Sequence, residues 1–420
     1  MINIMQLLSK EKDILPIREQ YRIFDEILLD RIQNLMPRLM RECGVDMWLV
    51  ICREYAEDPV FKTLTPMLVK NASRTSCFLF SLDARGNYEA LSLSRPDPRL
   101  FPFYKQAYDP KQESQFEAIR RAVEERSPEH VAVNISEDCA QADGMTKYLW
   151  DQLVPVLDGK MAADDRIAIR WLETRTPKEL ELYPSAYRIA MDVLREAYSR
   201  DVIQPGVTTT TDVEWFIMQR INDMGLDAWF SPDVDLQRRG GSEERMSGVV
   251  IEEGDLLHTD MGLTYLGELH TDSQRLGYVL RKGETEIPAG ILAGFAKGNR
   301  FQDIVRGAFQ TGLTGNQIFA NAVAQAKAEG LRPMLYSHPI GVYGHGAGPS
   351  IGMYDNQGFV PGHGEEIMHD DTCYALELNV TEQVPEWDSQ DVCFMLEETI
   401  AFTGGETHFM DNGRRTIIAI

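Results

Sequence analysis

Apolar side chains recur at helical spacing over residues 24–43, and an uninterrupted apolar run follows at Trp48–Cys52. The first pattern predicts a helix with one buried face, and the second predicts a buried strand. Two more apolar segments, Ser76–Leu82 and Tyr88–Ser94, are joined by the turn sequence DARGN at residues 83–87. They predict a β-hairpin, so the N-terminal part of the chain is expected to mix helices with strands.

This pattern continues with a helix predicted at Ser114–Glu125 and a buried strand predicted at His130–Ile135. The segment Asp158–Arg166 is polar and small, with little to bury, and indicates a domain boundary shortly after it. We therefore expect two domains, an α/β domain at residues 1–170 and a second domain at residues 171–420. The first domain contains a single histidine and no cluster of potential ligands. It is therefore expected to shape or cover the site of the second domain, or to mediate oligomerisation, rather than to catalyse.

The second domain opens on the sequence Thr176-Pro177-Lys178-Glu179. This sequence combines a hydroxyl cap, a proline at the first helical position and an acidic first turn. We expect a helix from there through about Ser199, and a second helix that follows Thr211 and ends near Gly225.

A repeat lies inside the second domain. The stretch from Gly206-Val207-Thr208 to Gly225-Leu226 is echoed about 105 residues later by the stretch from Gly312-Leu313-Thr314 to Gly330-Leu331. Each copy consists of a Gly-apolar-Thr turn, a helix, and then Gly-Leu and a strand. The repeat predicts a pseudo-twofold domain built from two related α/β halves.

Composition and charge restrict the partners of the chain. With 420 residues, 43% of them hydrophobic, there is material for two cores. The 42 basic and 65 acidic residues leave a net charge of −23, which repels nucleic-acid phosphates and anionic lipid, so neither a nucleic-acid nor a membrane partner is expected. No apolar run approaches the ~20 residues of a bilayer span, and the charged start at residues 1–13 does not fit a signal peptide. Six cysteines without a CxxC motif indicate reduced thiols, and the protein is expected to be soluble and cytoplasmic.

Residues with catalytic chemistry concentrate in the second domain, where seven of the eight histidines follow position 257. Two of them, His338 and His345, lie in SHPIGVYGHGAGP, whose glycines and prolines argue against a regular helix. The echoes CYALE, ending at Glu377, and CFMLE, ending at Glu397, predict two strands that present both glutamates into one space. Asp260 and Asp272 lie upstream in short extended segments.

Bringing these four carboxylates together without a cation would be prohibitive. A single pair at 4 Å repels by about 4 kcal/mol at an effective dielectric constant near 20. Hard oxygen ligands with one imidazole suit a pair of divalent ions such as Mn²⁺, Co²⁺ or Zn²⁺, and water held between such ions would supply a nucleophile at neutral pH.

The series Asp260-x-Gly262, Asp272-x-x-Arg275, His338-x6-His345, Glu377 and Glu397-Glu398 resembles the creatinase/aminopeptidase P/prolidase family of metallopeptidases. The resemblance implies an α/β (α+β) fold. Its C-terminal part would be a pita-bread domain with an internal pseudo-twofold, preceded by a smaller α/β domain of the creatinase/prolidase N-terminal type. The resemblance also implies a homodimer.

The resemblance implies a ligand set for two divalent ions. Asp272 and Glu397 would bridge the two ions, with Mn²⁺ expected and Co²⁺ or Zn²⁺ as alternatives. Asp260 would ligate one ion, and His338 and Glu377 would ligate the other.

The resemblance also implies two catalytic roles and a reaction. Glu377 would carry a proton from the attacking water to the departing nitrogen, and His345 would donate a hydrogen bond to the developing oxyanion. The expected reaction is hydrolysis of Xaa-Pro bonds in dipeptides or short peptides, as in an Xaa-Pro dipeptidase or an aminopeptidase P.

Three departures from the family pattern bear on the substrate. Asp260 and Asp272 are 12 residues apart where the family usually has 11, so the turn at Gly267–His270 is expected to absorb one residue as a bulge. The window Arg239–Glu243 lacks a histidine that the family has in its substrate pocket, and Met395 stands where the family usually has an arginine. The ligand residues are thus intact while substrate-side groups are changed.

These departures leave alternatives open. One is a family member repurposed for a non-peptide substrate, such as a lyase or a creatinase-like hydrolase, and the creatinase branch works without metal. Another is a non-catalytic scaffold, which the retention of all five ligand-type residues disfavours. His258 and His270 could reach the metal or replace the missing histidine, and Trp229 and Tyr343 could line an apolar substrate pocket.

Overall fold

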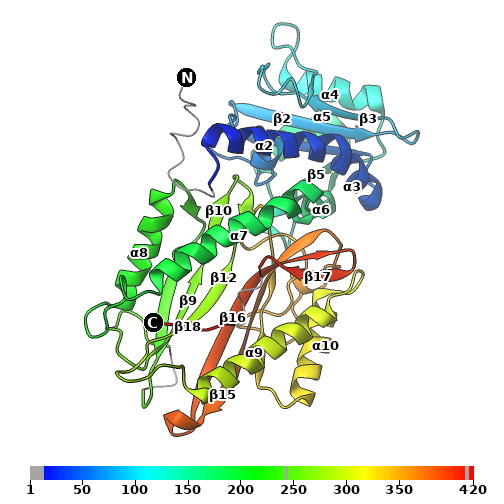
Figure 1. Ribbon diagram of the computed structural model, residues 1–420. Coiled ribbons are helices and arrows are strands. Elements are labelled where there is room, and N and C mark those ends of the chain that lie inside the picture. The colour runs from blue at the N-terminus through cyan, green and yellow to red at the C-terminus, as the bar shows by residue number, and fades with distance from the viewer. Residues whose placement is uncertain (1–13, 242–244, 412–415) are drawn as a thin grey trace, which may run out of the picture. The chain divides into compact units, whose positions relative to one another are not determined.

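The computed structural model describes residues 14–241, 245–411 and 416–420. The chain divides into two compact units, Leu15–Thr176 and Pro177–Ile420, of which the second also includes Ile14. Each unit has its own sheet and its own helices (Figure 1). None of the helices in these ranges combines the length and the apolar character that a bilayer span requires.

The N-terminal unit is built on a six-stranded sheet with the order β4-β3-β2-β1-β5-β6. β1 pairs antiparallel with β2, β2 and β3 form the predicted hairpin, and β5 and β6 extend the sheet in parallel with β1. The strands are β1 (Met47–Arg53), β2 (Thr75–Leu82), β3 (Tyr88–Ser92), β4 (Lys105–Gln106), β5 (Val131–Val133) and β6 (Met161–Ala163). The mixed α/β class predicted for this part of the chain is confirmed.

This unit also contains helices, some of which share an apolar core with the sheet. The helices are α2 (Ile17–Asp30), α3 (Met36–Cys43), α4 (Gln115–Arg126), α5 (Lys147–Leu157) and α6 (Arg166–Glu173). Ser114 caps α4 and completes a capping box with Glu117, which explains why this helix starts where the sequence predicts. Apolar side chains of β1, β2 and β5 pack against those of α4 and α5 to form the core.

The helix predicted over residues 24–43 begins earlier, at Ile17, and is interrupted by a π-helical turn at Arg31–Leu35. Pro37 accounts for the interruption, because proline lacks a backbone N–H and its ring crowds the carbonyl of the preceding turn. The prediction is therefore correct in position but not in regularity.

The C-terminal unit contains a nine-stranded sheet whose main path is β13-β15-β16-β12-β9-β8, with β14 on β15, β17 on β16 and β18 on β12. A smaller sheet has the order β11-β10-β7. The strands are β7 (Asp227–Ala228), β8 (Asp233–Gln237), β9 (Leu256–Met261), β10 (Leu263–Tyr265), β11 (Leu269–His270), β12 (Ser273–Tyr278), β13 (Pro333–Leu335), β14 (His338–Ile340), β15 (Thr372–Val384), β16 (Gln390–Thr403), β17 (Glu406–Phe409) and β18 (Ile418–Ala419).

Two helix pairs repeat one local design on this sheet. α7 (Pro177–Ala197) and α8 (Thr210–Asp223) precede the edge strand β8, and α9 (Ala289–Ala308) and α10 (Gly315–Ala328) precede the edge strand β13. α8 contacts β8, and α10 contacts β13. The two α/β halves predicted from the sequence repeat are therefore confirmed.

The second helices of the two halves also begin and end alike. Thr209 and Thr314 each cap their helix through a complete capping box. Gly225 and Gly330, both with left-handed backbone angles, follow the two helices. Each pair is separated by 105 residues, so the repeat is in register from cap to cap.

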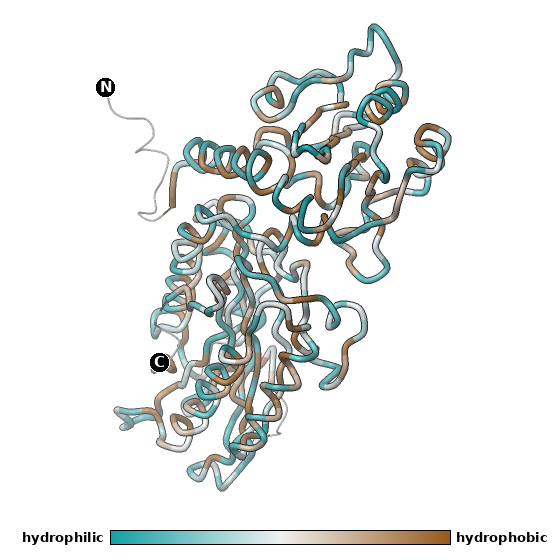
Figure 2. The backbone as a smooth tube through the Cα atoms, turned by 90° about the vertical axis from the view of Figure 1, so that its right-hand side faces the viewer, coloured by the Kyte–Doolittle hydropathy of each residue, from teal (hydrophilic) through white to brown (hydrophobic). Residues whose placement is uncertain are grey.

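The core of the C-terminal unit lies between α9, α10 and the long strands β15 and β16. Hydrophobic and hydrophilic residues alternate along the long helices of the chain, as expected where one helix face is buried (Figure 2). A Cβ atom at Gly294 or Gly298 of α9 would overlap Phe394 or Leu396 of β16. α9 therefore packs closely on β16, the strand that carries Glu397.

Candidate metal centre

Five polar residues form one row across the sheet of the C-terminal unit. Asp233 lies opposite Asp260, Asp260 opposite Gln274, Gln274 opposite Glu397, and Glu397 opposite Glu377. Directly opposed residues on neighbouring strands point to the same face, with Cβ atoms about 5 Å apart. The row therefore gathers four carboxylates and one amide on one face of β8, β9, β12, β16 and β15.

Asp272 and His338 join this row. Asp272 directly precedes β12 and lies two residues before Gln274, so the two side chains share a face. His338 begins β14, and its Nε2 lies 3.6 Å from Asp272 Oδ2, 3.9 Å from Glu397 Oε1 and 4.0 Å from Glu377 Oε2. The structure thus brings all five predicted ligand residues together.

The ligand-type atoms form two groups, and within each group they lie within 4.8 Å of one another. One group consists of Asp272, His338 and Glu397, and the other of Asp260, Glu377 and Glu397. Glu397 belongs to both groups, which is the place that the resemblance gives to a bridging ligand. Glu377 groups with Asp260, whereas the resemblance pairs it with His338.

Burial dominates the electrostatics of these carboxyl groups. Together with repulsion from Asp260, burial raises the pKa of Glu377 to about 8. Burial also raises the pKa of Asp260 to about 6. Burial and repulsion between neighbouring carboxylates raise the pKa values of Asp272 and Glu397 well above the usual range. Without a cation, the cluster therefore holds protons at neutral pH.

His338 is held as a neutral imidazole. Burial, with a contribution from His345, lowers the pKa of His338 to about 4. Its Nδ1 lies 3.0 Å from the Pro339 carbonyl, which can only accept a hydrogen bond, so Nδ1 carries the proton. The Nε2 lone pair therefore faces the carboxylates, as in a metal-ligating histidine whose other nitrogen is fixed by a carbonyl.

Several buried oxygen atoms of the cluster have no hydrogen-bond donor among the described residues. They are Asp260 Oδ1, Asp272 Oδ1, Gln274 Oε1 and both carboxylate oxygens of Glu397. Buried acceptors normally have a partner, and each one left without costs about 1–3 kcal/mol. An oxygen-rich set with one imidazole suits divalent cations, so the residues present fit a divalent metal centre.

Gln274 is the member of the row that the sequence patterns did not single out. An uncharged amide is not among the residue types by which such a site is recognised in a sequence. The available signal was its even spacing from Asp272 within an extended segment, which places both side chains on one face.

A buried ion pair fixes the reverse face of the same strands. Arg275 Nη2 lies 2.9 Å from Glu398 Oε2 and donates to the Tyr187 hydroxyl of α7 at 2.6 Å. Its Nη1 donates to the Glu397 carbonyl at 3.1 Å. Arg275 thus neutralises Glu398 and ties β12 to β16 directly behind the ligand residues.

The turn Leu266–Glu268 absorbs the additional residue of the hairpin that carries the two aspartates. Pairing keeps one register from the tip, where Tyr265 lies opposite Leu269, to the base, where Asp260 lies opposite Gln274. The first two residues of the turn have positive φ angles of 52° and 75°. The predicted bulge is therefore wrong, because a three-residue turn accommodates the insertion without shifting the strands.

Trp229 explains two glycines of the sequence motifs. A Cβ atom at Gly262 or Gly344 would overlap the indole ring. The indole Nε1 also donates to the Thr271 carbonyl at 2.8 Å. Trp229 thus packs between the segment that carries the aspartates and the segment that carries the two histidines.

The histidines around the centre differ in their surroundings. His345 is exposed, and its ring centroid lies 4.7 Å from that of His338. His258 is buried, with Nδ1 3.0 Å from Asp235 Oδ2. His270 Nδ1 lies 2.9 Å from a backbone carbonyl. Neither His258 nor His270 belongs to the two ligand groups.

An arginine reaches Met395 from a distant part of the chain. Arg245 Nη1 lies 3.3 Å from Met395 Sδ and 3.1 Å from Asp235 Oδ2. Its charge acts to lower the pKa values of Asp260 and Glu377, although burial outweighs this effect at both. The Arg245 side chain keeps 37% of its surface exposed. A guanidinium group therefore lies beside Met395, the position at which the family usually has an arginine.

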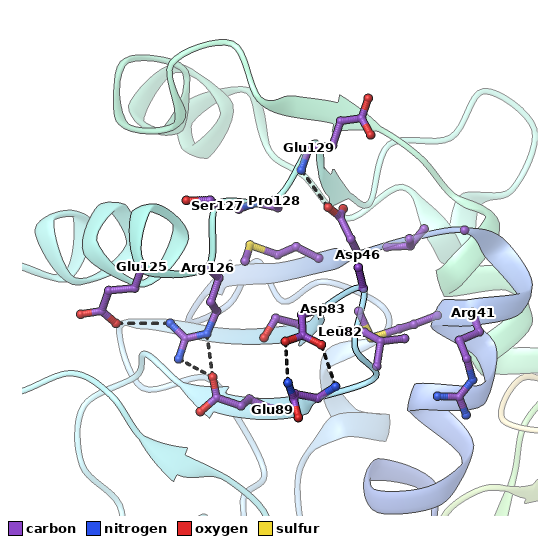
Figure 3. A pocket seen from close by; sticks show the side chains of 17 residues that line it. Arg41, Asp46, Leu82, Asp83, Glu89, Glu125, Arg126, Ser127, Pro128 and Glu129 are labelled. Carbon is purple, nitrogen blue, oxygen red and sulfur yellow. Dashed lines mark hydrogen bonds and ion pairs between the residues drawn. The ribbon is translucent and has the colours of Figure 1, made fainter.

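The N-terminal unit contains a pocket with a volume of about 660 Å³ (Figure 3). Several charged groups in this pocket pair with one another or with the backbone. Arg126 lies 2.6 Å from Glu89, and Asp46 accepts a hydrogen bond from the Glu129 backbone N–H at 2.8 Å. Both ligand groups found in the described ranges lie in the C-terminal unit, so this pocket is not a competing metal site.

Comparisons with known proteins agree with this site. A sequence profile of metallopeptidase family M24 matches residues 181–404, whereas no curated protein gives a significant match to the sequence. Among solved structures, the X-Pro aminopeptidase from Thermotoga maritima MSB8 is 15% identical, with 91% of this chain and 100% of that chain covered and a TM-score of 0.64. The Xaa-Pro dipeptidase from Bacillus anthracis is 15% identical, with coverages of 96% and 99% and a TM-score of 0.62. The prolidase from Pyrococcus horikoshii OT3 is 14% identical, with coverages of 95% and 100% and a TM-score of 0.57.

At these identities, the structural likeness shows the fold, which is the predicted pita-bread architecture. The family match covers more than half of the chain, so the chain belongs to metallopeptidase family M24. It is thus a hydrolase of the metallopeptidase class, and the resemblance read from the ligand series is confirmed. Members of this family use divalent metal ions, which agrees with the two groups of carboxylate and imidazole ligands.

Proposed function

We propose that this protein is a dinuclear metal-dependent peptidase that hydrolyses Xaa-Pro bonds in dipeptides or short peptides. The observation that carries the proposal is the pair of ligand groups that share Glu397. The three similar structures are an X-Pro aminopeptidase, an Xaa-Pro dipeptidase and a prolidase, which supports the substrate class. Mn²⁺ is the proposed ion, with Co²⁺ or Zn²⁺ as alternatives.

Five residues are proposed to hold the metal ions, and Glu397 is the ligand common to both. They are Asp260, Asp272, His338, Glu377 and Glu397. Bound divalent ions supply Lewis acidity toward the substrate carbonyl and lower the pKa of water. The protein residues described next would orient the peptide and move the proton.

Glu377 is the proposed proton carrier. Its Oε1 accepts a hydrogen bond from Gln274 Nε2 at 2.6 Å, which holds the carboxyl group in one orientation. Its Oε2 is then available to take a proton from the attacking water and to deliver it to the departing proline nitrogen. The Glu377 side chain is 18% exposed, more than that of Asp272 or Glu397, so a substrate can approach it.

Two residues are proposed to act on the substrate side. His345 is exposed beside His338 and would donate a hydrogen bond to the oxyanion that develops from the scissile carbonyl. Arg245, whose side chain is 37% exposed beside Met395, would pair with the free carboxylate of a dipeptide. A carboxylate contact of this kind favours dipeptides over longer peptides.

The test is to incubate the Mn²⁺-loaded protein with Ala-Pro, Ala-Pro-Ala and Ala-Ala and to quantify the released amino acids. We expect cleavage of the two Xaa-Pro substrates, with Ala-Pro preferred, and little cleavage of Ala-Ala. No release from any Xaa-Pro peptide, together with turnover of a non-peptide amide, would overturn the proposal.

A second candidate is a family member that acts on a non-peptide substrate by a lyase or creatinase-like reaction. Met395 favours it, as does the histidine-free window Arg239–Glu243, of which residues 242 and 243 lie outside the described residues. Elemental analysis separates the creatinase-like alternative from the others, since two bound ions favour a metal-dependent enzyme and none favours a creatinase-like or inactive protein. A homodimer and a cytoplasmic location remain predictions.

A further inference from the structure

Gln274 is an uncharged residue placed between two carboxylates of the candidate metal centre. It lies between Asp260 on β9 and Glu397 on β16, at the centre of the row of carboxylates. Only 4% of its surface is exposed. Its two direct cross-strand neighbours are thus both carboxylates that belong to the ligand groups.

The amide nitrogen of Gln274 already has two partners. Nε2 donates to Glu377 Oε1 at 2.6 Å and lies 3.3 Å from Asp260 Oδ2. These two carboxylates belong to the same ligand group, so the amide links them across two strands. The nitrogen therefore contacts both carboxylates of this group.

The amide oxygen of Gln274 is buried, and no donor among the described residues reaches it. A buried carbonyl oxygen without a donor is costly. Once a bound cation displaces the protons of the neighbouring carboxyl groups, those groups can only accept, and the cation is then the remaining partner for this oxygen. Amide carbonyl oxygens are ordinary ligands for hard divalent ions.

Charge balance favours a neutral ligand at this position. The four carboxylates of the ligand groups, Asp260, Asp272, Glu377 and Glu397, carry four negative charges when ionised, which two divalent ions would balance. Asp233 lies in the same row but is exposed to solvent, so its charge is screened. A further carboxylate at the buried position of Gln274 would leave one uncompensated negative charge there. An amide adds an oxygen ligand without adding charge.

We propose that Gln274 is a further residue of the metal centre, with Oε1 as a neutral ligand for the cation held by Asp260, Glu377 and Glu397. The inference rests on the proposed metal centre and goes beyond the five ligands that the resemblance implies. It assigns to this chain an oxygen ligand on β12, two residues after Asp272.

The test measures Mn²⁺ binding by calorimetry on metal-stripped protein, together with the electron paramagnetic resonance spectrum of the bound ion. Gln274→Met keeps the size of the side chain and removes both amide atoms. We expect it to weaken binding of one of the two ions by about 10–100-fold and to change that ion's spectrum, while the other ion binds as in the wild type.

Gln237→Met is the matched control. Gln237 is a glutamine of β8 with 2% exposure, and both of its amide atoms bond to the Cys393 backbone, at 2.7 and 2.9 Å. Its replacement should lower the melting temperature without changing Mn²⁺ affinity. Gln274→Glu, which retains the side-chain shape, should bind Mn²⁺ more tightly than the wild type and melt at a lower temperature in EDTA.

Wild-type affinity and an unchanged spectrum in Gln274→Met would overturn the inference while leaving the metal centre in place. Equal losses of affinity in Gln274→Met and Gln237→Met would also overturn it, because general destabilisation would then explain both. A wild-type protein that binds no Mn²⁺, Co²⁺ or Zn²⁺ would instead overturn the proposed metal centre itself.

Discussion

Glu377 and Glu397 lie directly opposite each other on the antiparallel strands β15 and β16. Their side chains are only 18% and 1% exposed. Like charges at directly opposed positions destabilise a strand pair, and burial deepens the penalty. Both strands are largely buried around this pair, so the pair is compatible with the fold only when protons or cations neutralise it.

Metal removal should therefore destabilise the protein. A ligand that binds only the folded state stabilises it by about 2.7 kcal/mol at a free concentration of 100 times Kd. We expect the Mn²⁺-loaded protein to melt at a higher temperature than the EDTA-treated protein at neutral pH. In Glu397→Gln, which alters both ligand groups, most of this difference should vanish. Identical melting curves with Mn²⁺ and with EDTA would contradict a metal centre at this site.

Glu377→Gln tests proton transfer when it is assayed at the Mn²⁺ content of the wild type, because Glu377 is also a proposed metal ligand. The amide keeps the shape of the side chain but cannot carry the proton, so kcat for Ala-Pro should fall by about 10²–10⁴-fold. Glu382→Gln is the control, because Glu382 lies on the same strand and pairs with Lys297 at 2.6 Å. This control should keep wild-type kcat and metal content. A kcat for Glu377→Gln close to that of the wild type would exclude Glu377 as the proton carrier.

Arg245→Met should change the preference between substrates. Loss of a charged hydrogen bond to the substrate carboxylate costs about 1.5–3 kcal/mol, or about 10–100-fold in KM for Ala-Pro. The KM for a C-terminally amidated Ala-Pro should be almost unchanged. Arg239→Met is the control, because Arg239 pairs with Asp388 and is similarly exposed. Equal changes in KM for Ala-Pro and for the amidated Ala-Pro would show that Arg245 does not bind the substrate carboxylate.

Asp58 in the N-terminal unit should produce a pH dependence unrelated to the metal. Its carboxyl group is 3% exposed, accepts from Asn134 Nδ2 at 2.9 Å, and has its pKa raised to about 6 by burial. A carboxyl group whose pKa rises on folding binds more protons in the folded state, so stability falls between about pH 4 and pH 6 and stays lower above. A rise of that size corresponds to at most ~3 kcal/mol.

The Asp58→Asn variant isolates this contribution. Its free energy of unfolding in urea should lack the fall that Asp58 causes. The free energy of unfolding of the wild type should therefore decrease relative to that of the variant between pH 4 and pH 7. A constant difference between the two proteins across that range would show that the Asp58 carboxyl group titrates alike in the folded and unfolded states.

The features that the sequence predicts correctly are those encoded locally. Thr314 and Gln317 form a capping box within four consecutive residues, so the start of α10 can be predicted without knowledge of any distant contact. The same holds for the strands that end in CYALE and CFMLE, where the period of two places each glutamate on a defined face. The two strands are also joined by a short connection, which makes their pairing a natural expectation.

The features that the sequence does not predict depend on register between distant segments. Gln274 is 123 residues from Glu397, and only the pairing of β12 with β16 makes them neighbours. Arg245 reaches Met395 from a loop whose path no periodicity describes. Tertiary packing decides both contacts, so local spacing points to the charged residues that the structure brings together but misses an amide and a guanidinium group beside them.

Because the three-residue turn Leu266–Glu268 closes the hairpin, the positions of the two aspartates do not depend on the length of that turn. Because the register is the same at the tip and at the base, a change of length confined to the turn need not shift either aspartate. One residue inserted between Asp272 and Gln274 would instead send Asp272 to the reverse face, beside the Arg275 ion pair. Gly267 is the exposed residue of the turn, whereas Leu266 and Glu268 are 2% and 6% exposed, so a change in turn length requires these two side chains to repack while the aspartates keep their places.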